Sequence, residues 1–340
     1  MVERPTIFYM NNCKLMQQLY KEEFPPMERQ KVTVGKERAV YFAVKENFTF
    51  SYYEKILCDA VYSIWVLYRY LRDSVEKYEG RREMTFTVTD VLACMSGKDD
   101  IRIRKTKDGR PGKEERLIES LEKLGKADIG IWWEEERKER KLTGVSPVIA
   151  GKFLPIRRID GTGKFRLNLD VGLPVYEYAA ALHQMIRIPE MLLSCGKREL
   201  ENGDKIPVLA LQNSDETLML KHQIIQRLEL LRNEKNRFTN RKIRYYYESH
   251  RKEGDVDGLF ATMGIRKEQF ASDSAWANKK QALDRQAHAI LDYYCNIGYL
   301  ENYVDAGIGK GRKRRAAVIG VDLEGVIKDP MNLIPEITEE

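Results

Sequence analysis

Residues 276–323 read WANKKQALDRQAHAILDYYCNIGYLENYVDAGIGKGRKRRAAVIGVDL, and this stretch decides the fold. Counted from Leu283, apolar residues recur at helical spacing, and Trp276 extends the stripe toward the N-terminus. The stripe consists of Leu283, Ala287, Ile290, Leu291, Tyr294 and Ile297. The spacing predicts an amphipathic helix whose apolar stripe lies in the core.

The opposite face of this helix carries polar residues of a particular kind. They are Asn278, Gln281, Arg285, His288 and Asp292. Asn and Gln side chains pair with adenine, and Arg pairs with guanine. Asn278, Gln281 and Arg285 fall in the N-terminal half, where groove-entering helices make their base contacts. We therefore expect these three to read DNA bases.

A basic hairpin is predicted after the helix. Residues 299–304 form its first strand, 307–309 a turn and 316–323 the return strand. Five cations in the six residues 310–315 would neutralise phosphates and give a salt-sensitive, sequence-independent part of the affinity. Either piece alone also fits a solvated helix or a basic loop, but the order of helix, turn and basic hairpin favours DNA contact. The expected phosphate-binding residues are Lys279, Lys280, Lys310, Arg312, Lys313, Arg314, Arg315, Arg241, Lys242 and Arg244.

Length and composition set broad limits. A chain of 340 residues is long enough for about two domains, and its net charge of +6 is modest, so the basicity is local. No apolar run approaches the ~20 residues that span a bilayer, and the N-terminus lacks a secretory apolar segment. The five cysteines never form a Cys-x-x-Cys pair, which indicates reduced thiols. We expect a cytoplasmic protein without a membrane partner.

The first half shows a related order of elements. Apolar residues from Tyr52 to Leu71 recur at helical spacing, and a short helix follows with Thr87 as N-cap, Asp90 at the capping-box position and Gly97 at its end. A polar loop spans 98–113. The later elements are a helix at 114–124, a strand at 129–133 and a charged turn at 134–141. Two strands follow at 145–159 and 164–169, joined by a turn at 160–163.

The charges of the first half suggest another role. Its third helix carries Glu115, Glu119 and Glu122 beside Arg116 and Lys123, a face that phosphate would repel. Sequence reading is therefore assigned to the second half. The first half would touch the DNA backbone through its loop, or would be the surface by which two chains associate. The loop cations are Arg102, Arg104, Lys105, Lys107, Arg110 and Lys113.

The second half repeats the order of the first. A long helix is predicted over residues 220–231 and a short one over 238–249, ahead of the helix and hairpin described above. The expected organisation begins with an N-terminal arm at 1–47, which contains one short helix or strand, and a first domain at 48–173. A helical connection with a linker follows at 174–216, then a second domain at 217–325 and a tail at 326–340.

This pattern resembles a known family, the iteron-binding replication initiators of theta-replicating plasmids and mobile elements. The resemblance covers residues 48–325, is best over 283–320, and rests on element order. It implies a mainly α protein with small β-wings (α+β), built from two tandem winged-helix domains. It also implies base reading by Asn278, Gln281 and Arg285, phosphate contact by 312–315, and dimerisation and backbone contact by the first domain. Host replication proteins would be further partners. The acidic third helix and the long loop of the first half depart from the family pattern.

Catalytic patterns are missing from the sequence. The four histidines, His183, His222, His250 and His288, are isolated, whereas nicking enzymes place two around one apolar residue to hold a metal. Residues 161–164 resemble the end of a phosphate-binding loop but lack its first glycine and its Ser or Thr. We expect no catalytic residue, no metal and no cofactor. A carboxylate cluster formed only in three dimensions stays open.

The sequence leaves three functions in competition. The first is sequence-specific binding of double-stranded DNA as a replication initiator at repeated origin sites. The second is a transcriptional regulator built from the same domains, whose sites would form a palindrome instead of direct repeats. The third is a protein-interaction scaffold, which predicts little salt-dependent affinity for DNA.

Overall fold

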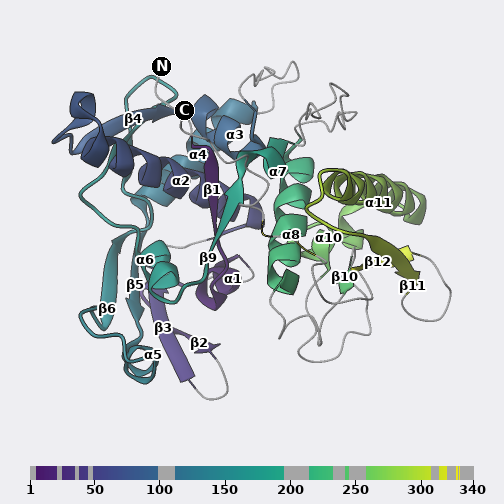
Figure 1. Cartoon of the computed structure of the whole chain (residues 1–340), viewed down its shortest axis with the longest axis horizontal. Helices are drawn as coiled ribbons and strands as arrows, with labels where there is room; N and C mark the ends of the chain where they lie inside the picture. The colour runs from purple at the N-terminus through teal and green to yellow at the C-terminus, as the bar shows by residue number, and fades with distance from the viewer. Residues whose placement is uncertain are drawn as a thin grey trace, which may run out of the picture. The chain divides into compact units, whose positions relative to one another are not determined.

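The chain has an α+β fold with several small sheets, seen in a computed structural model (Figure 1). The structure describes residues 5–20, 25–34, 38–44, 49–98, 112–194, 214–232, 242–244, 258–307, 314–319, 327 and 329. The chain divides into two compact units, Met1–Ile186 and Arg187–Glu340. The division falls inside the region expected as a helical connection and linker, of which residues 195–213 lie outside the described residues.

Unit 1 is organised around the long helix α2 (Tyr52–Ser74). Ser51 caps its N-terminus: the Ser51 hydroxyl accepts from the Glu54 N–H, and the Glu54 carboxylate accepts from the Ser51 N–H at 2.7 Å. The apolar stripe predicted for this helix is buried, apart from the half-buried Tyr53. The periodicity therefore predicted both the helix and its buried face.

The short elements after α2 include a helix that local signals predicted well. The 3-10 turn η1 (Glu76–Tyr78) and strand β4 (Glu83–Thr87) lead into α3 (Val88–Ser96). Thr87 and Asp90 form the predicted capping box, and Gly97 ends α3 in the left-handed region at φ 65°. The next helix, α4 (Lys113–Lys126), matches the predicted third helix.

A three-stranded sheet follows with the order β4-β8-β7, where β7 is Ile156–Arg158 and β8 is Lys164–Asn168. The predicted hairpin is confirmed, but the single strand expected over 145–159 is two strands. Its first part, β6 (Val148–Lys152), belongs to a different sheet. The break follows from the buried residues 153–155: the Phe153 N–H donates to Ala127 O at 2.8 Å, and Pro155 has no N–H for a ladder.

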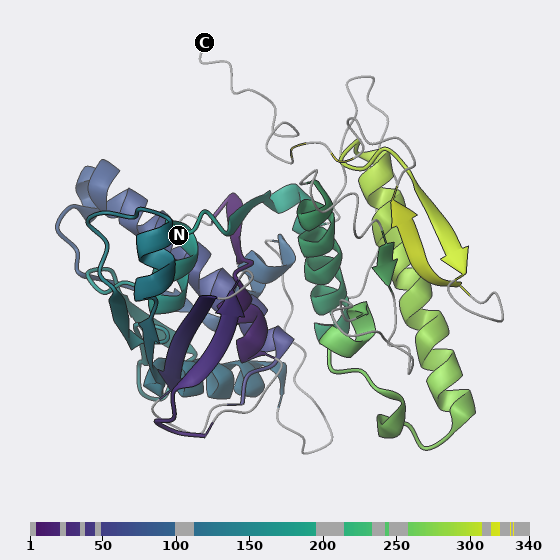
Figure 2. The ribbon, with the colours of Figure 1, turned by 90° about the horizontal axis from the view of Figure 1, so that it is seen from below.

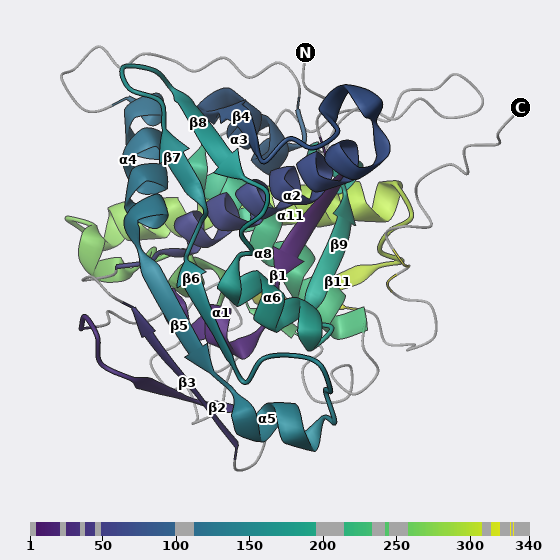
Figure 3. The ribbon, with the colours of Figure 1, turned by 90° about the vertical axis from the view of Figure 1, so that its left-hand side faces the viewer.

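The other sheet of unit 1 is four-stranded, in the order β2-β3-β5-β6 (Figure 3). Its remaining strands are β2 (Gln30–Val34), β3 (Arg38–Val44) and β5 (Asp128–Trp132). The segment expected as a charged turn is the short helix α5 (Glu134–Glu139). Acids in its first turn and cations in its last favour a helix, and Glu134 pairs with Arg137 and Lys138 at 3.2 and 3.0 Å.

The N-terminal residues are part of the core of unit 1, whereas the sequence suggested an arm with one short element. They form β1 (Ile7–Asn11), α1 (Lys14–Leu19), β2 and β3, and most of the apolar side chains described in them are buried. The helical connection expected from residue 174 is also interrupted. It consists of α6 (Pro174–Ala181), strand β9 (Met185–Pro189), which pairs with β1, and α7 (Glu190–Ser194). The expectation failed because β1 supplies pairing that the sequence of β9 does not reveal.

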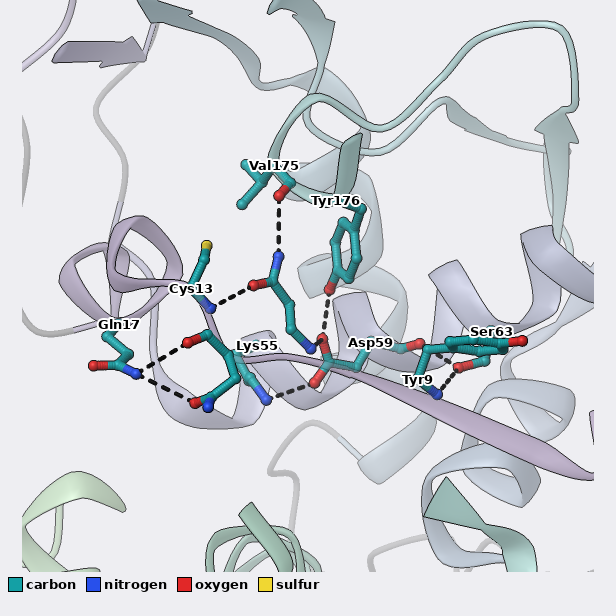
Figure 4. A network of polar contacts seen from close by, with 10 residues as sticks. Tyr9, Cys13, Gln17, Lys55, Asp59, Ser63, Val175 and Tyr176 are labelled. Carbon is teal, nitrogen blue, oxygen red and sulfur yellow. Dashed lines mark hydrogen bonds and ion pairs between the residues drawn. The ribbon is translucent and has the colours of Figure 1, made fainter. Parts of the chain in front are cut away.

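A buried polar network ties β1 and α6 to α2 (Figure 4). The Asp59 carboxylate accepts from the Tyr176 hydroxyl at 2.7 Å and from the Asn11 N–H at 3.2 Å, and it lies 2.6 Å from the Lys55 ammonium. The Asn11 side chain donates to Val175 O at 3.1 Å. Lys55 and Asp59 are fully buried, so each charge depends on the other and on these hydrogen bonds.

Unit 2 contains two long helices, with a short strand and two short helical segments between them in the sequence (Figure 2). In chain order it has α8 (Asp215–Arg232), β10 (Lys242–Arg244), α10 (Leu259–Thr262), the 3-10 turn η2 (Lys267–Gln269), α11 (Asp273–Asn296), β11 (Tyr303–Gly307) and β12 (Arg314–Ile319). Helix α11 is the one predicted from the opening stretch, and its apolar stripe is buried. Trp276 is only half-buried.

The sheet of unit 2 has the order β10-β12-β11. The sequence predicted a short helix over 238–249, but residues 242–244 are a strand whose Ile243 lies opposite Ala317. The order repeats that of β4-β8-β7 in unit 1: in both units the strand after the long helix pairs with the last strand of the hairpin. The two units therefore share one plan, into which unit 1 inserts β5, α5 and β6 between its third helix and its hairpin.

Candidate nucleic-acid interface

Helix α11 presents an open polar face in its N-terminal half. Asn278, Gln281 and Arg285 are exposed, and their spacing of three and four residues places them on one side of the helix. Leu283 and Ala287 anchor the opposite side in the core. The structure thus brings the three predicted base-reading residues together on a solvent-facing surface.

The C-terminal half of the same face contacts β11. His288 Nε2 lies 2.6 Å from the Asp305 carboxylate, and the Asp292 carboxylate accepts from the Tyr303 hydroxyl at 2.7 Å. These two polar clasps hold the hairpin to the helix. The sequence placed both residues on the solvent face: Asp292 is exposed as expected, whereas His288 is half-buried. The difference arises because a helical pattern cannot show which strand packs on the helix.

The clasps also define the direction of the hairpin. Tyr303 meets Asp292 and, two residues later, Asp305 meets His288, so β11 runs antiparallel to α11 (Figure 2). Two strand residues advance about 6.6 Å and four helical residues about 6 Å, so the two elements stay in step. Gly307, which is paired with Arg314, therefore lies toward the Arg285 end of the helix.

Two cations expected at phosphates are engaged within the protein. The Lys279 ammonium pairs with the Glu216 carboxylate of α8 at 2.6 Å. The Lys280 ammonium lies 5.4 Å from the centre of the Trp276 ring, which also contacts Phe270. Both lysines are half-buried, so of the charged residues along this part of α11, Arg285 is the more exposed.

The basic hairpin is described in part. Arg241, Lys310, Arg312 and Lys313 lie outside the described residues, and for Lys242, Arg244, Arg314 and Arg315 the structure describes the backbone. Arg314 and Arg315 belong to strand β12, whereas the sequence placed them in the loop before it. The register moves from Ala306 opposite Ala316 to Gly307 opposite Arg314, so Arg315 is the extra residue of a β-bulge. Strand β10 brings Lys242 and Arg244 into the same sheet, opposite Val318 and Ala316.

In unit 1, most of the loop expected at the DNA backbone lies outside the described residues: Arg102, Arg104, Lys105, Lys107 and Arg110. Lys113 is the first residue of α4.

Two acidic residues of α4 form contacts within unit 1. The Glu115 carboxylate accepts from the Gly112 N–H at 2.7 Å, and Glu122 pairs with Arg158 at 3.1 Å. Part of the negative charge expected to repel phosphate is thus used inside unit 1.

The sequence reasoning missed a cationic surface on the hairpin of unit 1. Arg157 lies directly opposite Arg166, and both are exposed. They border a groove of about 570 Å³ with an apolar floor that includes Leu121, Ile156 and Phe165. The alternation of Lys164 and Arg166 on one face of a strand was the available signal.

The described residues also bear on metal binding, thiol chemistry and membrane insertion. Within them, no group of three or more His, Cys, Asp or Glu side chains could hold a metal ion. Cys13, Cys58 and Cys94 are buried, and burial raises the pKa of the Cys13 thiol to about 12, which makes it a poor nucleophile. None of the helices in the described ranges combines the length and the apolar character needed to cross a membrane.

Comparisons with known proteins add little to this picture. No family model matches the chain, and no curated protein matches it. Among solved structures, the crystal structure of selenomethionine derivatives of domains 2 and 3 of RctB is similar over 86% of this chain and 91% of that chain, with 12% sequence identity and a TM-score of 0.33. This superposition is too loose to establish a shared fold.

Proposed function

We propose that the chain binds duplex DNA through unit 2, with α11 in the major groove and the β11–β12 hairpin on the phosphate backbone. The observation that carries this proposal is the exposed row of Asn278, Gln281 and Arg285 beside a hairpin that is held to the same helix. These residue types form specific pairs with adenine and guanine edges. The hairpin, whose sequence carries the cations of 310–315, supplies contacts that do not depend on base sequence.

We further propose that both units are winged helices. Each has a long helix, a strand, a short helix, a third helix and a hairpin, with the first strand paired to the last. A third helix that enters the groove while the hairpin contacts the adjacent backbone is the arrangement by which helix-turn-helix relatives dock on DNA. The groove-facing role falls to α11 because α4 presents exposed Glu115 and Glu119.

A replication initiator that binds repeated origin sites, without catalysis, is the specific function we propose for this pair of units. The tandem repetition of one plan supports it, because two DNA-binding units in one chain suit an extended site. Unit 1 would then contribute backbone contact or association with a second chain. The direct-repeat arrangement of sites distinguishes this function from a transcriptional regulator that binds a palindrome.

The test is a salt titration of the purified full chain with two labelled duplexes, one from the region flanking its own gene and one with the same bases shuffled. Tight binding to the flanking duplex alone supports sequence reading, and counting the copies bound per fragment then separates repeated sites from a single palindrome. Failure to bind either duplex at moderate salt would refute the proposal and favour a protein-interaction scaffold.

A further inference from the structure

We infer that unit 1 binds a short acidic segment of a partner protein, anchored by an apolar side chain, in the groove between α4 and the β7–β8 hairpin. This site goes beyond the proposed function, because its ligand is a peptide and it does not require DNA binding by unit 2. Three properties of the groove point to such a ligand: its size, its apolar floor and the charges on its rim.

The groove follows the line where α4 meets β7, two elements that lie side by side (Figure 3). The helix and the strand approach closely at Gly125, where an added Cβ would lie 2.8 Å from the Ile156 carbonyl oxygen. Pro155, which precedes β7, and Val171, which follows β8, also line the groove. Its volume of about 570 Å³ is within the roughly 300–1,000 Å³ of sites that enclose a small ligand, so it suits a few residues of a partner.

The floor of the groove is apolar. It includes the buried residues Leu121, Ile156 and Phe165, and Val171 at the edge keeps 38% of its surface exposed. A ligand side chain that covers Val171 and the floor removes apolar surface from water, which favours the binding of an apolar group. A phosphate or a sugar would gain nothing from this floor. The floor therefore favours a peptide that contains a bulky apolar residue.

The rim of the groove carries cations that are available to a ligand. Lys126 ends α4 and Arg157 lies in β7; both are exposed, and neither forms an ion pair within the described ranges of the chain. Arg166 of β8 lies 3.7 Å from Glu83, which is longer than a hydrogen bond. An arginine guanidinium can hold a carboxylate by two parallel hydrogen bonds. Acidic residues on either side of the apolar anchor would therefore meet these cations.

The other charged residues of the lining are engaged within unit 1. Glu122 pairs with Arg158 at 3.1 Å, so this carboxylate is already neutralised. The Lys152 ammonium pairs with Asp128 and donates to the Lys126 carbonyl oxygen, both at 3.0 Å, which satisfies an acceptor at the C-terminal end of α4. The lining as a whole contains five cations and two acids, so an approaching carboxylate meets net positive charge.

A peptide suits the groove better than a duplex does. Helix α4 exposes Glu115 and Glu119 along its length. A duplex is much wider than the groove, so on this hairpin it would also lie against α4 and be repelled by these carboxylates. An extended peptide is narrow enough to contact the groove alone.

Affinity in this groove requires both the charges and the apolar anchor. Exposed ion pairs each contribute little because water and salt screen them, so an acidic peptide without an apolar residue should bind poorly. An apolar peptide with basic flanks would be repelled by the rim cations. The expected ligand therefore has a bulky apolar residue with acidic residues on both sides.

The experiment measures the fluorescence anisotropy of a short labelled peptide as the purified full chain is added. The probe has a central Leu-Phe pair with Asp-Glu on each side; one control peptide has Lys-Lys flanks, and another has a Ser-Ser centre. The probe should bind saturably, and more weakly at about 0.3 M than at about 0.05 M salt. Each control should bind at least about tenfold more weakly than the probe. A probe that binds no better than either control would overturn the inference.

Variants of the chain locate the bound peptide. Arg157→Glu and Lys126→Glu should each raise the Kd of the probe about tenfold, because each removes an ion pair and adds a repulsion. Val171→Asn should raise it about fivefold with an unchanged salt dependence, because it removes apolar contact only. Lys77→Glu makes the same change of charge at an exposed position outside the groove and should have little effect. Equal effects of Lys77→Glu and Arg157→Glu would mean that the probe senses only net charge, which contradicts a built site. Thermal unfolding checks that each variant is folded.

Two other occupants of the groove predict different results. If the rim cations served DNA phosphates, Arg157→Glu would weaken binding of a shuffled duplex as strongly as binding of the probe, whereas the peptide site predicts an unchanged Kd for the duplex. If a second copy of this chain filled the groove, sedimentation velocity would show self-association that Arg157→Glu abolishes. Either result would refute the peptide site. A wild-type chain that binds the probe but no duplex would support this inference and refute the proposed function.

Discussion

The ammonium of Lys279 lies 2.6 Å from the carboxylate of Glu216, so a lysine on the proposed DNA-binding helix is neutralised by the neighbouring helix α8. Glu216→Gln should release this lysine for a phosphate. We expect the affinity for any duplex to rise roughly fivefold near 0.1 M salt, with a salt slope steeper by about 0.9. Glu301→Gln removes an exposed acid that frees no lysine and serves as the control. Equal gains in both variants would mean that only net charge matters.

Arg285 should distinguish specific from random DNA. Arg285→Ala is expected to weaken binding to the flanking duplex by about 1–3 kcal/mol, because a two-pronged guanine contact is lost, and to affect shuffled DNA much less. Arg285→Lys keeps the charge but not the fork, so it should lose most of the specificity and little of the non-specific affinity. Competition binding with both duplexes measures this. Equal losses on the two duplexes would remove the base-reading role.

The hairpin cations should act on all duplexes alike. Changing Arg312, Arg314 and Arg315 to Ala should weaken every duplex and flatten the salt slope by about two to three, since each phosphate contact contributes about 0.9. The matched control removes three exposed cations of unit 1, Lys77, Arg81 and Arg82. An identical slope change in the control would show that the hairpin has no special role.

Gly125 is a position in α4 where a side chain does not fit. A Cβ there would lie 2.8 Å from the Ile156 carbonyl oxygen and 3.0 Å from the Ile156 Cγ1, so Gly125→Ala must push β7 away from α4. Despite the better helix propensity of Ala, we expect a loss of about 1–3 kcal/mol in the free energy of unfolding. Urea denaturation measures it, with Lys126→Ala, an exposed neighbour, as the control. Unchanged stability would contradict the close packing of helix and strand.

The buried pair Lys55 and Asp59 predicts a pH effect on stability. Lys55→Met leaves the carboxylate without its cation, and we expect a loss of about 3–5 kcal/mol, much of it recovered in the double variant with Asp59→Asn. Burial raises the pKa of Asp59 above its ordinary value, so the folded state retains a proton that the unfolded state has released.

Stability should therefore fall as the pH rises from the ordinary aspartate range through the raised pKa, and more strongly in Lys55→Met. Thermal unfolding at several pH values tests this sign. A double variant as unstable as Lys55→Met alone would contradict the dependence of one charge on the other.

The sequence predicted the features that local chemistry determines. Helices α2 and α11 follow from apolar residues at helical spacing, and the start and end of α3 follow from Thr87, Asp90 and Gly97. Such signals act within a few residues of one another, so no knowledge of the rest of the fold was needed to use them.

The features that were missed depend on partners far along the chain. Strand β10 is three residues long and is stabilised by β12, with Ile243 opposite Ala317. Helix α5 has no apolar stripe, and its one fully enclosed side chain is Glu136, whose carboxylate accepts from the Tyr178 hydroxyl at 2.6 Å. A pattern of hydrophobic residues cannot predict an element that is held by polar contacts.

The candidate site also has one feature that local sequence predicts and one that depends on a distant partner. The exposure of Asn278, Gln281 and Arg285 could be predicted from the face opposite the apolar stripe, and their role at DNA bases stays a prediction. The partial burial of His288 against β11 could not be predicted, because the pairing of His288 with Asp305 joins two elements whose relative placement no local pattern specifies.

Because unit 1 contains the insertion of β5, α5 and β6, the two units differ in how their third helix is connected to the hairpin. In unit 2 only a short tether joins the end of α11 at Asn296 to the start of β11 at Tyr303. A short tether keeps the hairpin at a high effective concentration beside the helix, where the contacts of Tyr303 and Asp305 with α11 and the pairing of β12 with β10 hold it. In unit 1, strands β5 and β6 and helix α5 lie between α4 and the hairpin in the sequence, so no short segment tethers that hairpin to its third helix.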